Sequence, residues 1–194
     1  MEIYDIIHGK ITIDPLAKRI IDTEEFQRLR SIKQLGCCNY VFPSATHTRF
    51  EHSIGVYHLA CKYITILNDK EEYYNETERK CVEIAALIHD LGHGPYSHLF
   101  DGLFEEEKNH EYRSIRIFIH MDKKYKFGFT EEEIEMIANI ILPGKDIPID
   151  KKYIYQIVSN PNGIDVDRFD YIMRDIKMTG LNYGIEYERI MNHS

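Results

Sequence analysis

Apolar residues recur every three or four positions along most of the chain, and only its beginning alternates as a strand does. The alternation over residues 3–13 turns around His8 and Gly9, which predicts a small hairpin. The longer periodic segments predict amphipathic helices. These helices cover residues 23–36, 50–67, 77–90, 110–119, 131–142, 153–158 and 164–177.

Polar residues at the segment ends mark where the helices begin and end. Asp22 is the predicted cap of the first helix, and Thr77 is the predicted cap of the helix that leads to His89. Thr130 begins another helix with a capping box. We expect Gly92 to end the His89 helix in the left-handed conformation.

The last predicted helix has an apolar side and a polar side, and Gly180 ends it. The apolar side consists of Ile164, Phe169, Ile172, Met173 and Ile176. The other side carries Asp167, Tyr171, Arg174 and Asp175. By itself this second pattern is typical of a solvated face with salt bridges.

The sequence has no second run of strands and no internal repeat. We therefore predict an all-α fold with a small N-terminal hairpin, in one domain over residues 1–194. A chain of 194 residues is long enough to bury a substantial core.

Composition narrows the class of protein. A net charge of −8 argues against a basic surface for nucleic acid or for an acidic membrane. No stretch is as long and apolar as a membrane span, and the first residues do not resemble a signal peptide. The four cysteines lack metal-site or CxxC spacing, so we expect reduced thiols in an intracellular, cytoplasmic or nuclear protein.

Residues 89–98 concentrate three histidines and one aspartate around two glycines and a proline. His89 and Asp90 lie at a predicted helix end, where carbonyl groups and the helix dipole favour a cation. A metal site needs at least two further ligands. His52 lies on the inward stripe of another helix, and one carboxylate of the last helix would complete a set of four. The candidates for that carboxylate are Asp165, Asp167 and Asp170.

Two imidazoles and two carboxylates suit iron, manganese or zinc, with open positions for water or substrate. Such an ion activates water and polarises a phosphoryl oxygen, so phosphoester hydrolysis is the expected chemistry. His93, His98 and His110 could steady phosphate oxygens or carry protons. Arg49, one turn before His52, could pair with a phosphate, although an ordinary surface arginine fits its spacing equally well.

Three motifs carry a family resemblance: RFEHSIG at residues 49–55, HDLGHGPYSH at 89–98 and GIDVDRFDYIMRD at 163–175. They resemble the HD-domain phosphohydrolases. The likeness is closest to the deoxynucleoside triphosphate (dNTP) triphosphohydrolases that, in eukaryotes, join a sterile-alpha-motif domain to an HD domain. Supporting stretches lie at residues 8–15, 20–36 and 41–53.

The resemblance implies water attack on the α-phosphate of a dNTP, which gives a deoxynucleoside and inorganic triphosphate. The implied ligands of a divalent iron, manganese, zinc or magnesium ion are His52, His89, Asp90 and Asp167. The implied catalytic residues are His93, His98, Asp101 and His110. Implied phosphate contacts are Arg49 and Arg168, and implied sugar contacts are Gln34, Leu35, Tyr171 and Asp175.

Regulated members of this family bind guanine nucleotide at a subunit interface, so the resemblance also implies a homo-oligomer with GTP or dGTP as activator. Asp22, Gln27 and Arg30 fit that pattern, and Met1 stands where it has a lysine. Longer relatives continue beyond the end of this chain. We therefore expect a C-terminally shortened catalytic core.

Two other functions stay open at this point. One is a different HD-type phosphohydrolase or phosphodiesterase, acting on nucleoside monophosphates, cyclic nucleotides or RNA ends. The other is a non-catalytic remnant that binds nucleotides.

Overall fold

The computed structural model describes residues 1–70, 74–102, 109–144 and 152–193. Strands β1 (Glu2–Asp5) and β2 (Gly9–Thr12) form an antiparallel hairpin, as predicted. Asp5 Oδ1 accepts hydrogen bonds from the backbone N–H groups of Ile7 and His8, at 2.8 and 3.0 Å. Gly9 follows with a φ of +68°, which glycine adopts at no steric cost and which closes the turn.

The segment after the hairpin departs from the predicted helix over residues 23–36. Its middle, Arg28–Ser31, is 3₁₀-helical, and around it Phe26, Leu29 and Ile32 are buried at a spacing of three, which matches three residues per turn. A further helix, absent from the prediction, precedes it, with proline at its first position. The elements of this segment are α1 (Pro15–Ile21), α2 (Glu24–Gln27), η1 (Arg28–Ser31) and η2 (Gly36–Tyr40).

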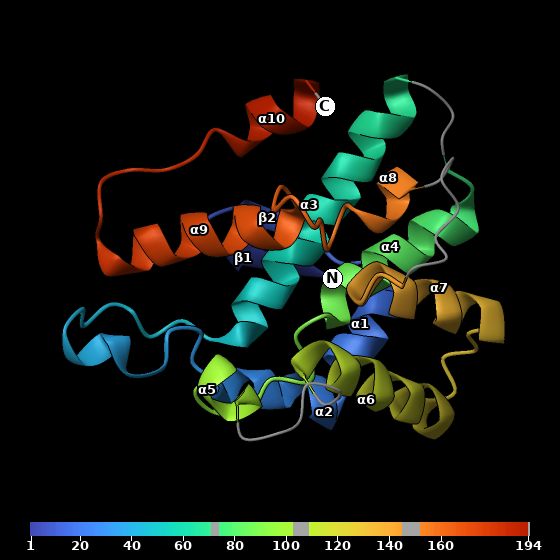
Figure 1. Cartoon of the computed structure of the whole chain (residues 1–194), viewed down its shortest axis with the longest axis horizontal. Coiled ribbons are helices and arrows are strands. Elements are labelled where there is room, and N and C mark those ends of the chain that lie inside the picture. The colour runs from blue at the N-terminus through green and yellow to red at the C-terminus, as the bar shows by residue number, and fades with distance from the viewer. Residues whose placement is uncertain (71–73, 103–108, 145–151, 194) are drawn as a thin grey trace.

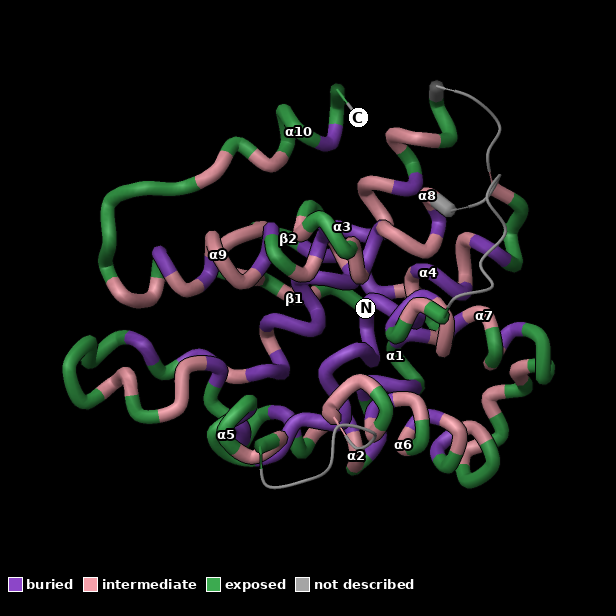
Figure 2. The backbone as a smooth tube through the Cα atoms, viewed as in Figure 1, coloured by how far each residue is buried: buried purple, intermediate pink, exposed green. Residues whose placement is uncertain are grey.

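Helix α3 (Arg49–Lys70) runs through the middle of the molecule (Figure 1). It packs against α4 (Glu76–Ile88) on one side and α9 (Val166–Thr179) on another. Figure 2 shows buried backbone concentrated where α3 and α4 meet. The packing of α3 against α4 therefore fixes the positions of side chains that lie between these two helices.

Further helices cover α4. Helix α7 packs on α4, and α6 packs on both of them. The remaining helices with their bounds are α5 (His98–Asp101), α6 (His110–Tyr125), α7 (Glu131–Ile141), α8 (Lys152–Tyr155) and α10 (Tyr187–His193). The all-α prediction is confirmed, since the described residues form helices apart from the hairpin and the loops.

Two helix caps differ from those predicted. The Thr23 hydroxyl, not Asp22, accepts the capping hydrogen bond of α2, while Asp22 forms an ion pair with Lys18 of α1. The cap of α4 is Asn75 rather than Thr77, because Asn75 lies at the extended residue before the helix and completes a capping box with Glu78.

The polarity of α9 also corrects the prediction. Ile164 precedes the helix and is 55% exposed, so it does not belong to the buried face. Arg174, expected on a solvated side, is 1% exposed. Its buried guanidinium is paired with Asp170 and Asp5, which removes the need for solvent.

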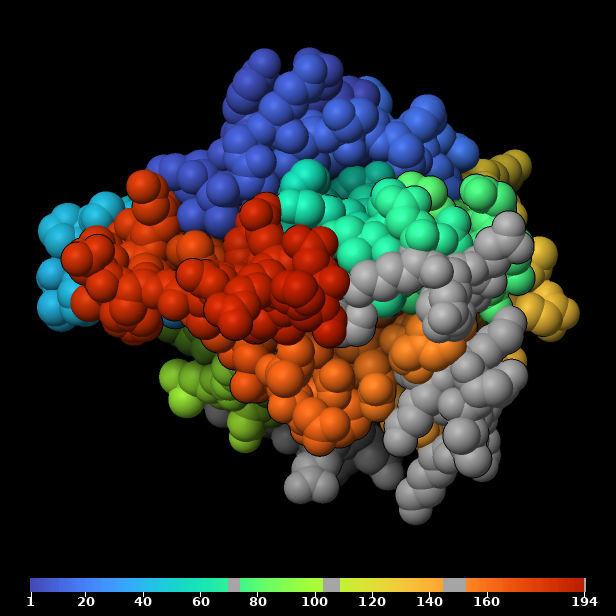
Figure 3. All heavy atoms as spheres, turned by 90° about the horizontal axis from the view of Figure 1, so that it is seen from above, coloured from blue at the N-terminus to red at the C-terminus, as the bar shows by residue number. Residues whose placement is uncertain are grey.

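The C-terminal segment crosses the surface beside the hairpin and α3, as Figure 3 shows. Glu188 of α10 pairs with Lys62 of α3 at 2.6 Å. Within the described ranges, no helix is both long enough and apolar enough to cross a membrane. The four cysteines form no disulfide.

Candidate functional site

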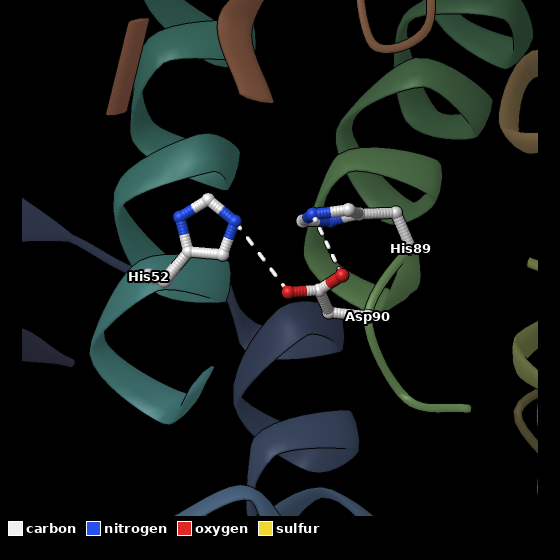
Figure 4. Close-up of side chains that lie close together, drawn as sticks. All are labelled: His52, His89 and Asp90. Carbon is white, nitrogen blue, oxygen red and sulfur yellow. Dashed lines mark ion pairs between the residues drawn. The ribbon is translucent and has the colours of Figure 1, made fainter. Parts of the chain in front are cut away.

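Four side chains meet where α3, α4 and α9 approach each other. His52 lies on the first turn of α3, His89 and Asp90 directly follow α4, and Asp167 lies on the first turn of α9. His52 Nε2 lies 3.0 Å from Asp167 Oδ1 and 3.5 Å from Asp90 Oδ2. His89 Nε2 lies 3.4 Å from Asp90 Oδ1 and 3.5 Å from Asp167 Oδ1. Figure 4 shows both rings turned toward Asp90.

The two imidazoles are oriented with their Nε2 atoms toward the shared site. Nδ1 of His89 donates to the carbonyl of Ala86 at 2.8 Å, and Nδ1 of His52 contacts Asp170 Oδ2 at 2.8 Å. Each Nε2 is buried and makes no hydrogen bond of acceptable geometry. Ligating atoms of His52, His89 and Asp90 lie within 4.8 Å of one another, so this group could hold a divalent ion.

In the metal-free protein the charged side chains of this group shift one another's pKa values toward the charged forms. Burial lowers the pKa of His52, but the carboxylates around it, Asp167 foremost, outweigh burial and raise it to about 10. Burial raises the pKa of Asp90, but Arg49 and His89 hold it well below its usual range. The neighbouring histidines likewise lower the pKa of Asp167 against the effect of burial. Asp90 and Asp167 therefore both stay ionised at neutral pH, which is the form that binds a cation.

The three acidic residues at the start of α9 have different surroundings. Asp165 caps the helix by accepting from the N–H of Arg168 at 2.8 Å. Asp170 is fully buried behind His52. Only Asp167 of the three directs an oxygen toward both Nε2 atoms.

A second group of histidines lies next to the first. The rings of His93 and His110 are stacked with centroids 3.8 Å apart, and His98 lies edge-on at 5.5 Å from each. His110 Nδ1 contacts Asp101 Oδ2 at 2.7 Å, which leaves its Nε2 available. Burial, helped by nearby cations such as Arg49, lowers the pKa of His93 to about 4, so this ring is neutral at pH 7.

Arg49 connects the two groups. Its Nη1 donates to Asp90 Oδ2 at 2.6 Å and its Nη2 to Ser97 Oγ at 2.8 Å. Tyr96 and Ser97 have φ values of 63° and 49°, a left-handed conformation that is costly for residues with a side chain. The guanidinium and this strained loop thus define one wall of the site.

A cavity of about 330 Å³ contains most of the predicted substrate contacts. Its lining includes Arg49, Asp90, Asp167 and the three histidines of the second group. The lining also contains Gln34, Leu35, Tyr171 and Asp175, which the resemblance implied for the sugar. Arg168 is exposed and lies against Gly163, outside this lining.

The residues implied for an activator lie away from the cavity. Gln27 donates to the carbonyl of Ile21 at 2.8 Å and accepts from Arg30 Nε at 2.8 Å. The Arg30 guanidinium also stacks on the ring of Phe50, 3.4 Å from its centroid. Asp22 does not contact them through a hydrogen bond or ion pair found among the described residues, because Lys18 holds its carboxylate.

Gly92 does not end the helix in the predicted left-handed conformation, but allows two backbone segments to approach closely. It does not adopt a positive φ, and a Cβ at this position would lie 2.1 Å from the carbonyl oxygen of His110. Glycine is required here because the first turn of α6 crosses the backbone. This close approach brings His110 next to His93.

Several residues that shape the site were not singled out from the sequence. His47 Nε2 contacts Asp175 Oδ1 at 2.7 Å, and Arg28 donates to the carbonyl of His93 at 2.9 Å. His8 contacts Asp170 at 2.7 Å. All three lie in the supporting stretches of the resemblance, so membership of those stretches was the available signal.

Comparison with known proteins gives consistent findings. The family model described as the HD domain matches residues 49–175. The mouse protein deoxynucleoside triphosphate triphosphohydrolase SAMHD1 is 43% identical over 216 aligned residues, which cover 96% of this chain and 33% of the mouse protein. Its Dictyostelium discoideum homolog is 41% identical over 201 residues, covering 99% of this chain and 39% of the homolog. The HD domain-containing protein L394 of Acanthamoeba polyphaga mimivirus is 44% identical over 209 residues, with 96% and 45% covered.

This chain therefore spans less than half the length of these curated relatives.

Proposed function

Because this chain belongs to the HD-domain family, we propose that it is a metal-dependent phosphohydrolase that converts a dNTP and water to a deoxynucleoside and inorganic triphosphate. The observation that carries the proposal is the meeting of two buried Nε2 atoms with two carboxylates at the edge of a cavity lined by Arg49 and three histidines. The similarity to proteins named dNTP triphosphohydrolases supports the choice of substrate.

We assign the metal ligands as His52, His89, Asp90 and Asp167. Two nitrogen and two oxygen donors suit iron, manganese or zinc better than magnesium, which prefers an all-oxygen shell. A bound ion would supply an acidified water and polarise a phosphoryl oxygen. The chain's own part is to hold the ligands with both carboxylates ionised and both Nε2 atoms facing inward.

Arg49 and the second histidine group act on the phosphates in this proposal. The Arg49 guanidinium lines the cavity and is held there by Asp90 and Ser97, so it can bind an anionic oxygen. Cleavage breaks the bond between the α-phosphorus and the 5′-oxygen, and that oxygen must gain a proton. Asp101 orients His110 for such a transfer, with His93 and His98 beside it.

The sugar and activator assignments rest on the resemblance. Gln34, Leu35, Tyr171 and Asp175 share the cavity, which supports a deoxyribose lying between α9 and the segment before α3. Arg168, which lies outside the cavity lining, is proposed as a phosphate contact on the same resemblance. We further propose homo-oligomerisation and activation by GTP or dGTP through the Asp22–Gln27–Arg30 region; the cytoplasm or nucleus would be the compartment.

The test is incubation of the full chain with each dNTP and added Mn²⁺, Fe²⁺, Zn²⁺ or Mg²⁺, with and without GTP, followed by separation of the products. Deoxynucleoside plus triphosphate from the wild type, but not from Asp167→Ala, is the expected result. Release of single phosphate would identify another phosphohydrolase. Binding of dNTP without turnover would instead favour a nucleotide-binding remnant.

A further inference from the structure

We propose that Asp170 and His8 are positioning residues of the metal centre: through them the N-terminal hairpin holds the ring of His52 with its Nε2 toward the metal. This inference rests on the proposed ligation by His52. It concerns two residues that touch neither the cavity nor the substrate, and it gives the hairpin a function at a site that none of its residues lines.

The Asp170 carboxylate is the junction of the network. Its Oδ2 accepts from His52 Nδ1 at 2.8 Å and from Arg174 Nε at 2.9 Å. Its Oδ1 accepts from His8 Nε2 at 2.7 Å and from Arg174 Nη2 at 2.9 Å. A carboxylate offers about four lone-pair sites, so these four donors saturate Asp170. It therefore has no free lone pair for a metal and can act only through His52.

Such an arrangement fixes which nitrogen binds a metal. When Nδ1 of a histidine donates its proton to a carboxylate, Nε2 is the nitrogen that gives up its proton to an arriving metal. Because Asp170 and His52 are both fully buried, water does not compete for this hydrogen bond. The ring orientation is thus set before any ion arrives.

Because Gly55 has no side chain, it leaves the space that the Asp170 carboxylate occupies. A Cβ on Gly55 would lie 1.9 Å from Asp170 Oδ1 and 2.6 Å from Arg174 Nη2. Gly55 follows His52 on α3 by one turn. The missing side chain therefore lets the carboxylate of α9 reach the ligand on α3.

Residues of the hairpin contact both Asp170 and Arg174. His8 is in the hairpin turn, and its side chain is 1% exposed. Asp5, at the end of β1, accepts from the backbone N–H of His8 at 3.0 Å and from Arg174 Nη1 at 2.7 Å. Two residues of the turn thus hold Asp170 and its partner Arg174 from the same side.

The first experiment measures the dissociation constant of Mn²⁺ by calorimetry for the full chain and three variants. Asp170→Asn should weaken Mn²⁺ binding about 10- to 100-fold, the range for partners of metal ligands. His8→Phe keeps a ring but removes the donor, and should weaken binding less than Asp170→Asn. His8→Gln places an amide N–H near the position of Nε2 and should restore most of the affinity.

The matched control is Ile140→Val, a core change in α7, which lowers stability without touching the network. It should bind Mn²⁺ as the wild type does, and urea unfolding of each metal-free variant separates stability from affinity. Wild-type affinity in Asp170→Asn and His8→Phe would overturn this inference alone. No Mn²⁺ binding by the wild type would overturn both this inference and the proposed function.

A second measurement does not depend on the variants folding. In ¹⁵N-histidine NMR of the Zn²⁺-loaded wild type, His52 should show a protonated Nδ1 with a downfield proton, as expected for a bond to a carboxylate. An unprotonated Nδ1 on His52 would overturn the inference.

Discussion

Arg49 is a single side chain that contacts both groups of site residues. Its two terminal nitrogens donate to Asp90, one of the assigned metal ligands, and to Ser97. The planar guanidinium makes both contacts at once, whereas a lysine ammonium is a single point charge. A guanidinium has five N–H donors, so these two hydrogen bonds leave further donors for a ligand.

We predict that Arg49→Lys lowers kcat/KM for dNTP although the positive charge is kept. Loss of one hydrogen bond to a charged group corresponds to about 1.5–3 kcal/mol, or roughly a 10- to 100-fold decrease. Steady-state kinetics at saturating metal would measure it. Arg19→Lys is the comparison, because that guanidinium donates only to carbonyl groups of the chain at the surface. Equal kinetics for the two variants would contradict the prediction.

At the scale of elements, α4 is the one whose exact position matters most. His89 and Asp90 directly follow it, so a shift of the helix moves two of the four assigned ligands. Its start is fixed by the capping box of Asn75 and Glu78.

We predict that Asn75→Ala lowers the free energy of unfolding by about 1 kcal/mol, within the 0.5–2 kcal/mol usual for a lost cap. Thr77→Ala should change it by much less, since Thr77 lies within the helix and does not cap it. Urea denaturation of both variants would measure the difference. A larger loss from Thr77→Ala would mean that the helix begins where the sequence alone suggested.

The contrast between these residues shows what the sequence could predict. The long helices from α3 onward, the hairpin and the Thr130 capping box follow from local periodicity and local hydrogen bonds, and the structure agrees with them. Asn75 and Thr77 are both residue types that cap helices, so the local pattern did not choose between them. The 3₁₀ turn after Phe26 was not predicted, because apolar residues three apart also fit an α-helix. Gly92 likewise looked like a helix end, because nothing nearby in sequence announces the crossing of α6.

For the candidate site the limit is similar. Histidines and carboxylates are conspicuous in a sequence, so His52, His89 and Asp90 could be named from the residue pattern. The choice of Asp167 over Asp165 and Asp170 needed the family resemblance. Arg174 could not be assigned to the interior, because an isolated arginine at helical spacing suits a solvated face. Its partners Asp5 and Asp170 become visible only once the hairpin is docked.

At the scale of the whole molecule, Asp5 and Arg174 bring together residues 169 positions apart in the chain. Burial raises the pKa of Asp5, but the hydrogen bonds from Arg174 and the turn outweigh it and leave the pKa below its ordinary value. A lowered pKa means that the carboxylate contributes stability above pH 4. That stability is lost as the pH falls through the folded-state pKa.

We predict that Asp5→Asn lowers the free energy of unfolding by about 1–3 kcal/mol at pH 7, and that the gap to the wild type narrows as the pH falls below 4. Asparagine keeps an oxygen for the turn but loses the charge facing Arg174. Urea unfolding across pH would test this. The control is Glu2→Gln in the same hairpin, whose half-exposed pair with Lys10 should matter little at any pH. A gap independent of pH would contradict the prediction.

The empty position at Gly55 has a consequence for how related sequences diverge. Since a methyl group there would overlap the Asp170 carboxylate, position 55 cannot gain a side chain while Asp170 stays. A lineage that acquires alanine at position 55 must first, or at the same time, give up the aspartate. A residue other than glycine at position 55 would thus identify, from sequence alone, relatives that have lost the carboxylate contact to His52.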